Sequence, residues 1–147
     1  MEKVVDKTKE VCASVVLIND KLNFKGIAGV NNPVSIDYIP PLGDNLGYTS
    51  LELLLLSLSS CIGSSVLLFL RKMKKTIAGF EIKSRGLRKE EHPTGFKIIF
   101  VEINLKSSDV TVDNMNKVIK LSEDTYCPVW SMIKGNAEID VKYKITS

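Results

Sequence analysis

The sequence has few of the residues from which most reaction centres are built. Among its 147 residues there is one histidine, His92, and three cysteines. It has no glycine-rich phosphate-binding loop, and one histidine among scattered carboxylates does not make a zinc site. We therefore expect neither a metal nor another cofactor, and the thiols are the remaining candidates for chemistry.

A concentrated basic stripe is also missing. The formal net charge is +3, and basic and acidic residues are interspersed along the chain. The one basic cluster, residues 71–75, is short and follows an apolar segment. Cations in that place stabilise the carboxyl end of a helix. We expect no nucleic-acid partner, because such a partner requires a larger basic surface.

The first ten residues do not resemble a secretory leader. Six of residues 1–10 are charged, and they contain no apolar core segment. We therefore expect a cytoplasmic protein whose thiols are reduced at rest. Its cysteines are then either packed as small apolar residues or reactive, and a structural disulfide framework is not expected.

Residues 51–70 form a long apolar run whose only charge is Glu52. Its length and its basic flank fit a membrane span. However, five serines, Cys61 and Gly63 dilute its hydrophobicity, and the segments on either side are typical of strands in a soluble sheet. We favour a helix of a soluble protein, covered by a sheet, other helices or a partner chain, and expect no membrane. Gly63 predicts close packing there, with the same helix of a second subunit as one candidate.

Turn-forming residues and hydrophobic periodicity divide the chain into nine elements. Their order predicts a single α+β domain over 1–147, with antiparallel strand pairing. It comprises an N-terminal β-meander (1–40), a central helix that carries Cys61 (49–75) and a ββααβ segment (76–147). The predicted strands are 10–18, 22–30, 34–39, 77–87, 96–105 and 137–145, and the predicted helices are 49–74 (opened by a Thr49/Glu52 capping box), 109–125 and 127–134.

Cys127 stands directly before Pro128. Proline is favoured at the first position of a helix, which places Cys127 at the N-cap. The helix dipole and unpaired backbone N–H groups there are expected to lower the pKa of the thiol and make it reactive. The alternative is that Cys127 only packs as a small apolar residue.

The other thiols and the histidine have weaker signals. Cys61 lies about ten residues inside its helix, beyond the reach of the dipole. It needs a cation from another segment to become nucleophilic, and otherwise it is a core residue. Cys12, in the first predicted strand, is expected to be structural. His92 is expected to be a solvated turn residue, unless its loop folds over a thiol and gives it a role in binding or proton transfer.

Three motifs taken together resemble the OsmC/Ohr superfamily, and in particular its OsmC-like branch. Residues 50–61 (SLELLLLSLSSC) match the "ELLL…C" helix of that branch. Residues 91–93 (EHP) match its loop, and residues 121–129 (LSEDTYCPV) match its "YCPV" helix start. The similarity extends from about Phe24 to the C-terminus and keeps the order of the elements.

The resemblance implies a tightly intertwined homodimer, in which antiparallel sheets from both subunits wrap the long central cysteine helices. It also implies reduction of organic hydroperoxides or related peroxides. Cys61 attacks the O–O bond and becomes a sulfenic acid, and Cys127 condenses with it to a disulfide. A thiol reductant, either a small dithiol or a thioredoxin-like protein, then restores both thiols without a metal or flavin.

The sequence departs from the characterised peroxidases in the residues that support the attacking thiolate. Those enzymes use an arginine from the N-terminal strands, oriented by a glutamate ten positions before the cysteine. Here Leu51 holds that position, Glu52 follows it, and the first arginine is Arg71. Lys21 or Lys25 could supply the charge but not a bidentate guanidinium clamp. The possible supporting residues are accordingly Glu52, His92 and Lys25.

Two other functions remain open at this point. The missing activating pair favours a non-catalytic protein of the same fold, which would bind a small apolar ligand in a cleft near Cys61. The other alternative is a thiol redox sensor that does not turn over.

Overall fold

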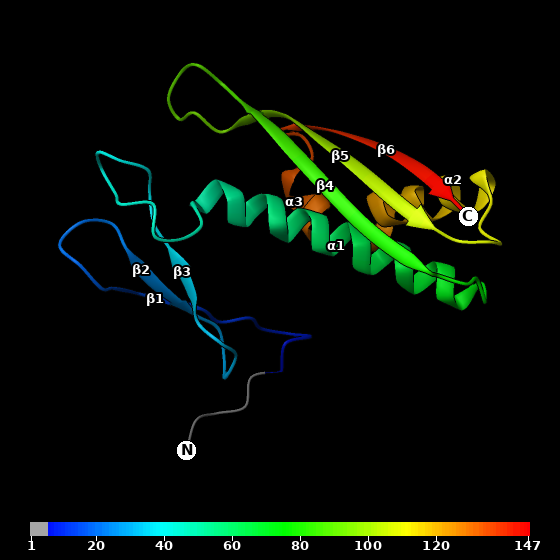
Figure 1. The fold of residues 1–147 in the computed structure, drawn as a ribbon, viewed down its shortest axis with the longest axis horizontal. Helices are drawn as coiled ribbons and strands as arrows, with labels where there is room; N and C mark the ends of the chain where they lie inside the picture. The colour runs from blue at the N-terminus through cyan, green and yellow to red at the C-terminus, as the bar shows by residue number, and fades with distance from the viewer. Residues whose placement is uncertain (1–5) are drawn as a thin grey trace. The chain divides into compact units, whose positions relative to one another are not determined.

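The structure, a computed structural model, describes residues 6–147 (Figure 1). The chain divides into two units, one that ends at Leu53 and one that runs from Leu54 to Ser147. The single domain over 1–147 stays a prediction.

The N-terminal unit contains the predicted meander. Strands β1 (Ser14–Leu17), β2 (Phe24–Ile27) and β3 (Val34–Ile36) form an antiparallel sheet in the order β1-β2-β3. The strands are shorter than the sequence predicts, and Gly29, with φ of 63°, turns the chain soon after β2. All four residues of β1 are exposed. Within this unit, neither face of that strand is covered.

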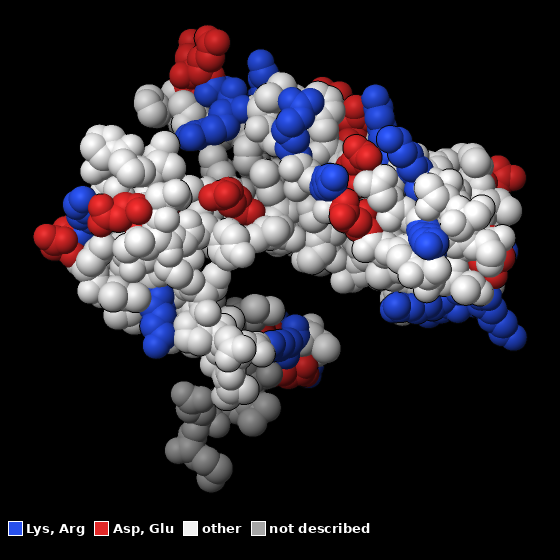
Figure 2. Space-filling model, in the orientation of Figure 1, with Lys and Arg blue, Asp and Glu red and all other residues white. Residues whose placement is uncertain are grey.

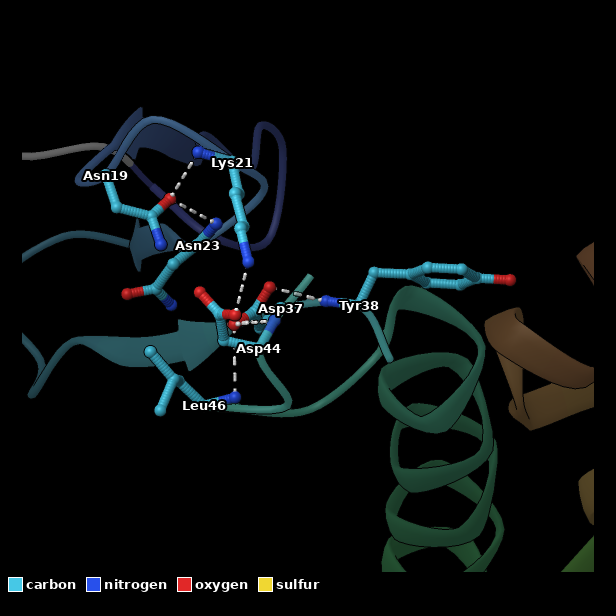
Figure 3. A network of polar contacts seen from close by, with 7 residues as sticks. All are labelled: Asn19, Lys21, Asn23, Asp37, Tyr38, Asp44 and Leu46. Atoms are coloured by element: carbon cyan, nitrogen blue, oxygen red, sulfur yellow. Dashed lines mark hydrogen bonds and ion pairs between the residues drawn. The ribbon is translucent and has the colours of Figure 1, made fainter. Parts of the chain in front are cut away.

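A buried carboxylate organises the loop that follows β3 (Figure 3). Asp37 accepts hydrogen bonds from the backbone N–H groups of Tyr38 (2.7 Å), Asp44 (3.3 Å) and Leu46 (3.1 Å). Burial would raise the pKa of Asp37, but these N–H groups and the charge of Lys21 together lower it below its usual value. The carboxylate of Asp37 therefore holds the loop of residues 37–46 together through three backbone hydrogen bonds.

Helix α1 (Ser50–Lys72) begins at the predicted capping box. The backbone N–H of Thr49 donates to Glu52 Oε1 (2.9 Å), and the backbone N–H of Glu52 donates to Thr49 Oγ1 (3.2 Å). Arg71 and Lys72 occupy the last turn, where they complement the helix dipole as the sequence indicated.

The C-terminal unit consists of a three-stranded sheet with its connecting helices. Its strands are β4 (Gly79–Arg88), β5 (Phe96–Lys106) and β6 (Glu138–Thr146), in the order β4-β5-β6. Between β5 and β6 the chain forms α2 (Val112–Leu121), the π-helical turn η1 (Ser122–Tyr126) and α3 (Pro128–Ile133).

The prediction of antiparallel pairing throughout is wrong for the last strand. β4 and β5 pair antiparallel, but β6 pairs parallel to β5 over nine residue pairs from Ile98↔Glu138 to Lys106↔Thr146. Parallel neighbours require a long crossover, and the α2–η1–α3 segment provides it. The sheet is consequently mixed.

The core of this unit joins one face of α1 to one face of the sheet. Residues spaced by four along α1 are fully buried, and so are alternate residues of β5. These residues are Leu58, Ile62, Val66 and Leu70 of α1, Ile99, Val101, Ile103 and Leu105 of β5, and Met115 and Val118 of α2.

Gly63 is buried against the sheet of its own chain. A Cβ at this position would lie 3.2 Å from side-chain atoms of both Phe80 and Ile82 on β4. The close packing that the glycine predicted is therefore present, but its partner is β4 rather than a second copy of α1.

Within a single chain α1 is only partly covered. It is the one helix among residues 6–147 that is long and apolar enough to cross a membrane, and 33% of its most apolar window is buried. Leu56 and Leu68 are 52% and 50% exposed. Length and composition alone are weak evidence for a span, since core helices of soluble proteins have both properties.

Charged side chains do not gather by sign on the face drawn in Figure 2, where lysine and arginine alternate with aspartate and glutamate.

Candidate thiol site

The C-terminal unit brings Cys61 and Cys127 near each other. Cys61 belongs to α1, whereas Cys127 lies sixty-six positions later at the junction of η1 and α3. Cys127 is buried, with 2% of its surface exposed, and Cys61 is half-buried. The pair thus has one accessible and one enclosed sulfur, and the expectation that folding places them together is confirmed.

The π-helical turn η1 directly precedes Cys127 and sets its position near Cys61. The backbone N–H of Cys127 donates to the carbonyl of Ser122 (2.9 Å), five residues earlier. Ser122 is fully buried, and its hydroxyl donates to the carbonyl of Val118 (2.8 Å). The sequence predicts an uninterrupted helix over 109–125 and gives no sign of this turn. Such turns occur often at functional sites.

Cys127 also caps the helix that follows it, as its position before Pro128 predicts. Its backbone is extended, with φ of −95° and ψ of 101°, and its sulfur accepts a hydrogen bond from the backbone N–H of Trp130 (3.5 Å). The predicted N-cap is confirmed.

Contrary to the prediction from the sequence, the cap does not lower the pKa of Cys127 overall. Burial and then the neighbouring thiol of Cys61 raise this pKa, the N–H groups of Trp130 and Val129 lower it, and the net result is a pKa of about 11. Burial dominates because the sulfur is enclosed, and a capping hydrogen bond to one thiolate cannot replace its hydration. Cys127 is therefore a protonated thiol near neutral pH.

Three of the five serines that dilute the apolar run on α1 form hydrogen bonds through their hydroxyls. Ser59 donates to Ser84 of β4 (3.0 Å), which links α1 to the sheet close to Cys61. Ser60 and Ser64 donate to carbonyls of the preceding helical turn, at 3.1 and 2.8 Å. These hydroxyls make α1 less apolar without leaving buried donors unpaired.

The predicted supporting residues have separate places. Glu52 serves the capping box, and hydrogen bonds from Thr49 lower the pKa of its carboxyl. His92 is exposed in the loop between β4 and β5. Lys25 is exposed on β2 and Lys21 pairs with Asp44 (2.7 Å), both in the N-terminal unit. Within the C-terminal unit the structure brings together only the two cysteines of the predicted set.

Cys12 is not packed as its expected structural role requires. It is exposed, and its thiol donates to Glu10 Oε1 (3.4 Å). The reason is that β1 begins only at Ser14, so Cys12 precedes the sheet.

A cleft of about 480 Å³ in the C-terminal unit lies over the sheet rather than at the thiols. Phe100 lines the cleft, and the Arg85 guanidinium lies 4.5 Å from the centroid of its ring. Charged residues such as Lys142 also line the cleft. Neither cysteine lines this cleft.

The fold and the thiol pair together define an α+β protein with two neighbouring cysteines, one on a long helix and one at a helix cap. A family model described as "OsmC-like protein" matches residues 43–142. Because the match covers more than half of the chain, this protein belongs to the OsmC-like family. No curated protein matches the sequence significantly.

Several solved structures share the fold. A hypothetical protein from Aquifex aeolicus aligns with a TM-score of 0.82 at 23% identity, over 93% of this chain and 96% of that one. An OsmC-like protein from Mycoplasma pneumoniae aligns with a TM-score of 0.81 at 18% identity, over 94% and 98%. The organic hydroperoxide resistance protein OhrB of Bacillus subtilis gives 0.63 at 15% identity, over 92% and 98%. At these identities the likeness concerns the fold.

Proposed function

We propose that this protein is a thiol-dependent redox protein that reduces organic hydroperoxides, or related peroxides, with Cys61 and Cys127. The observation that carries the proposal is the nearness of these two thiols in one unit of the chain. Membership of the OsmC-like family suggests a redox or peroxide-related role, and similar folds include organic hydroperoxide resistance proteins of Legionella pneumophila and Bacillus subtilis.

The reaction consumes one peroxide and two thiols. In the first step the Cys61 thiolate attacks one peroxide oxygen, so that an S–O bond forms, the O–O bond breaks and an alcohol leaves with a proton. In the second step the sulfur of Cys127 attacks the sulfenic sulfur of Cys61, an S–S bond forms and water leaves. A dithiol or thioredoxin-like reductant then returns both cysteines to thiols.

The contrast between the two sulfurs supports this division of roles. Cys61 is half-buried and accessible to a substrate, whereas Cys127 is enclosed and has a raised pKa. A protonated, enclosed thiol is a poor first nucleophile. It is suited to react second, once a sulfenic acid stands beside it and its proton leaves with the departing water. We assign the attack to Cys61 and the resolution to Cys127.

We further propose that the active form is a cytoplasmic homodimer. OsmC/Ohr proteins are commonly homodimeric, and one chain leaves apolar surface uncovered on β1 and α1, including Val15 (58% exposed) and Leu56 (52%). Lys25 and His92, both exposed, are the residues that we propose to examine as further support for the thiolate.

A second candidate function is the binding of a small apolar ligand without turnover. It is favoured by the absence of any arginine before Arg71 and by the use of Glu52 in the capping box. In that case Cys61 and Cys127 would stay reduced in the presence of peroxide.

The test is to expose the reduced protein to cumene hydroperoxide and to follow free thiols and intact mass. We expect the loss of two thiols and a mass decrease of about 2 Da, the signature of one disulfide. Cys61→Ser should abolish the reaction, and Cys127→Ser should leave a sulfenic acid on Cys61 that dimedone captures. Cys12→Ser is the matched control and should behave as the unaltered protein. Persistent thiols in excess peroxide, together with binding of a fluorescent fatty acid, would favour the second candidate.

A further inference from the structure

An aromatic contact lies next to the thiol pair. Tyr126, the last residue of η1, packs on Phe69 of α1 with ring centroids 4.7 Å apart and an angle of 58° between the rings. This tilted arrangement is favourable for two aromatic rings. It joins the residue directly before Cys127 to the helix that carries Cys61.

The positions along α1 make this contact relevant to the thiols. Cys61 and Phe69 are eight residues apart, so they lie about 12 Å apart along the helix axis and roughly 80° apart around it. Tyr126 and Cys127 are adjacent in sequence. The chain segment that carries Cys127 thus contacts α1 at two places, one at the aromatic rings and one at the sulfurs.

Other contacts also restrain this segment: Trp130 of α3 is buried, and Lys134 pairs with Glu123 of η1 (3.1 Å). The π turn depends on the hydrogen bond from Cys127 N–H to the Ser122 carbonyl, and its outer side carries the exposed ion pair Lys120–Asp124 (3.0 Å). Exposed pairs of this kind contribute little. Tyr126 is itself 52% exposed, so its ring acts through the contact with Phe69 rather than through burial in the core.

We propose that Tyr126 is a positioning residue, whose ring packs on Phe69 and holds Cys127 within bonding distance of Cys61. This inference rests on the proposed function, because it concerns the step in which the two sulfurs join. The aromatic ring, rather than the hydroxyl, positions Cys127, because within residues 6–147 the Tyr126 hydroxyl forms no hydrogen bond. Phenylalanine can therefore replace Tyr126. Loss of the ring lowers the effective concentration of one sulfur toward the other.

The test measures that effective concentration without any peroxide. The protein is equilibrated with oxidised and reduced dithiothreitol, and the fraction with a Cys61–Cys127 disulfide is read by mass spectrometry. Tyr126→Ala should lower the effective concentration about threefold to tenfold, the scale of one aromatic pair. Tyr126→Phe should leave it unchanged. In a double-mutant cycle, Phe69→Ala combined with Tyr126→Ala should cost less than the sum of the single changes.

The matched control is Met132→Ala, because Met132 lies on α3 beyond Cys127 and is 70% exposed. It should leave the effective concentration unchanged. An unchanged value for Tyr126→Ala, or an equal fall for Met132→Ala, would overturn the inference. If the unaltered protein forms the disulfide in the dithiothreitol buffer but does not react with peroxide, the proposed function fails while the positioning role stands. If it forms no disulfide in any buffer, the positioning role fails.

Discussion

The two sheets of this protein differ in how much of their surface a single chain covers. The sheet β4-β5-β6 has one face filled by α1 and α2, and Ile103 at its centre is fully buried. In the sheet β1-β2-β3 all four residues of β1 are exposed, and Val15 is 58% exposed. The first sheet belongs to a core that one chain completes. The second carries apolar surface that one chain leaves open, and it is there that we expect a partner subunit.

The largest expected effect concerns the closed core. Ile103→Ala should lower the free energy of unfolding by about 2–5 kcal/mol, because it removes buried methyl groups and leaves a cavity between α1 and the sheet. Urea denaturation at several protein concentrations measures it. The cost should be the same at each concentration if this core belongs to one chain. A loss of unfolding free energy that depends strongly on protein concentration would contradict the assignment of this core to one chain.

A second effect tests whether the closed interior extends to Cys127. Its folded pKa of about 11 lies above the ordinary thiol pKa of 9.0. Between these values the folded state holds a proton that the unfolded state has lost. The stabilisation is therefore complete below about pH 9 and is lost as the pH rises through 11.

The reduced protein should accordingly lose up to about 3 kcal/mol over this range relative to Cys127→Ser. Thermal unfolding of both proteins at intervals of pH measures the difference, and comparison with the serine variant cancels the titration of lysines and tyrosines. Parallel pH profiles for the two proteins would contradict the enclosure of this sulfur.

The smallest effect concerns the open sheet. Val15→Asp should raise the dissociation constant of the proposed dimer by about tenfold or more, since it places a charge in surface that the partner covers. Sedimentation equilibrium measures it. The control is Val30→Asp, at a position 93% exposed and outside the strands. Equal behaviour of the two variants would mean that β1 is not part of an interface.

Much of the fold follows from local sequence signals. The Thr49/Glu52 capping box marks the start of α1 because both reciprocal hydrogen bonds lie within four residues. Alternation along 97–105 identifies the buried face of β5, and Cys127 before Pro128 identifies a helix cap. Each of these features depends on neighbours in sequence, so the sequence contains the information needed.

The features that the sequence does not reveal depend on distant contacts. The parallel pairing of β6 depends on the path of the α2–η1–α3 crossover, which has no local marker. The pKa of Cys127 depends on enclosure by other segments, and burial outweighs the local cap. The π turn at Ser122 likewise has no local marker in the sequence. For the thiol site, the motifs single out the two cysteines that the fold brings near each other, whereas their unequal environments emerge only from packing.

The most direct test of the account is peptide mapping after oxidation. The reduced protein is treated with one equivalent of cumene hydroperoxide, blocked with a thiol reagent and digested without reduction. We predict one principal cross-linked species, in which the peptide containing Cys61 is joined to the peptide containing Cys127 of the same chain, and an alkylated Cys12. A cross-link through Cys12, or Cys61 and Cys127 both alkylated, would contradict the proposed pair.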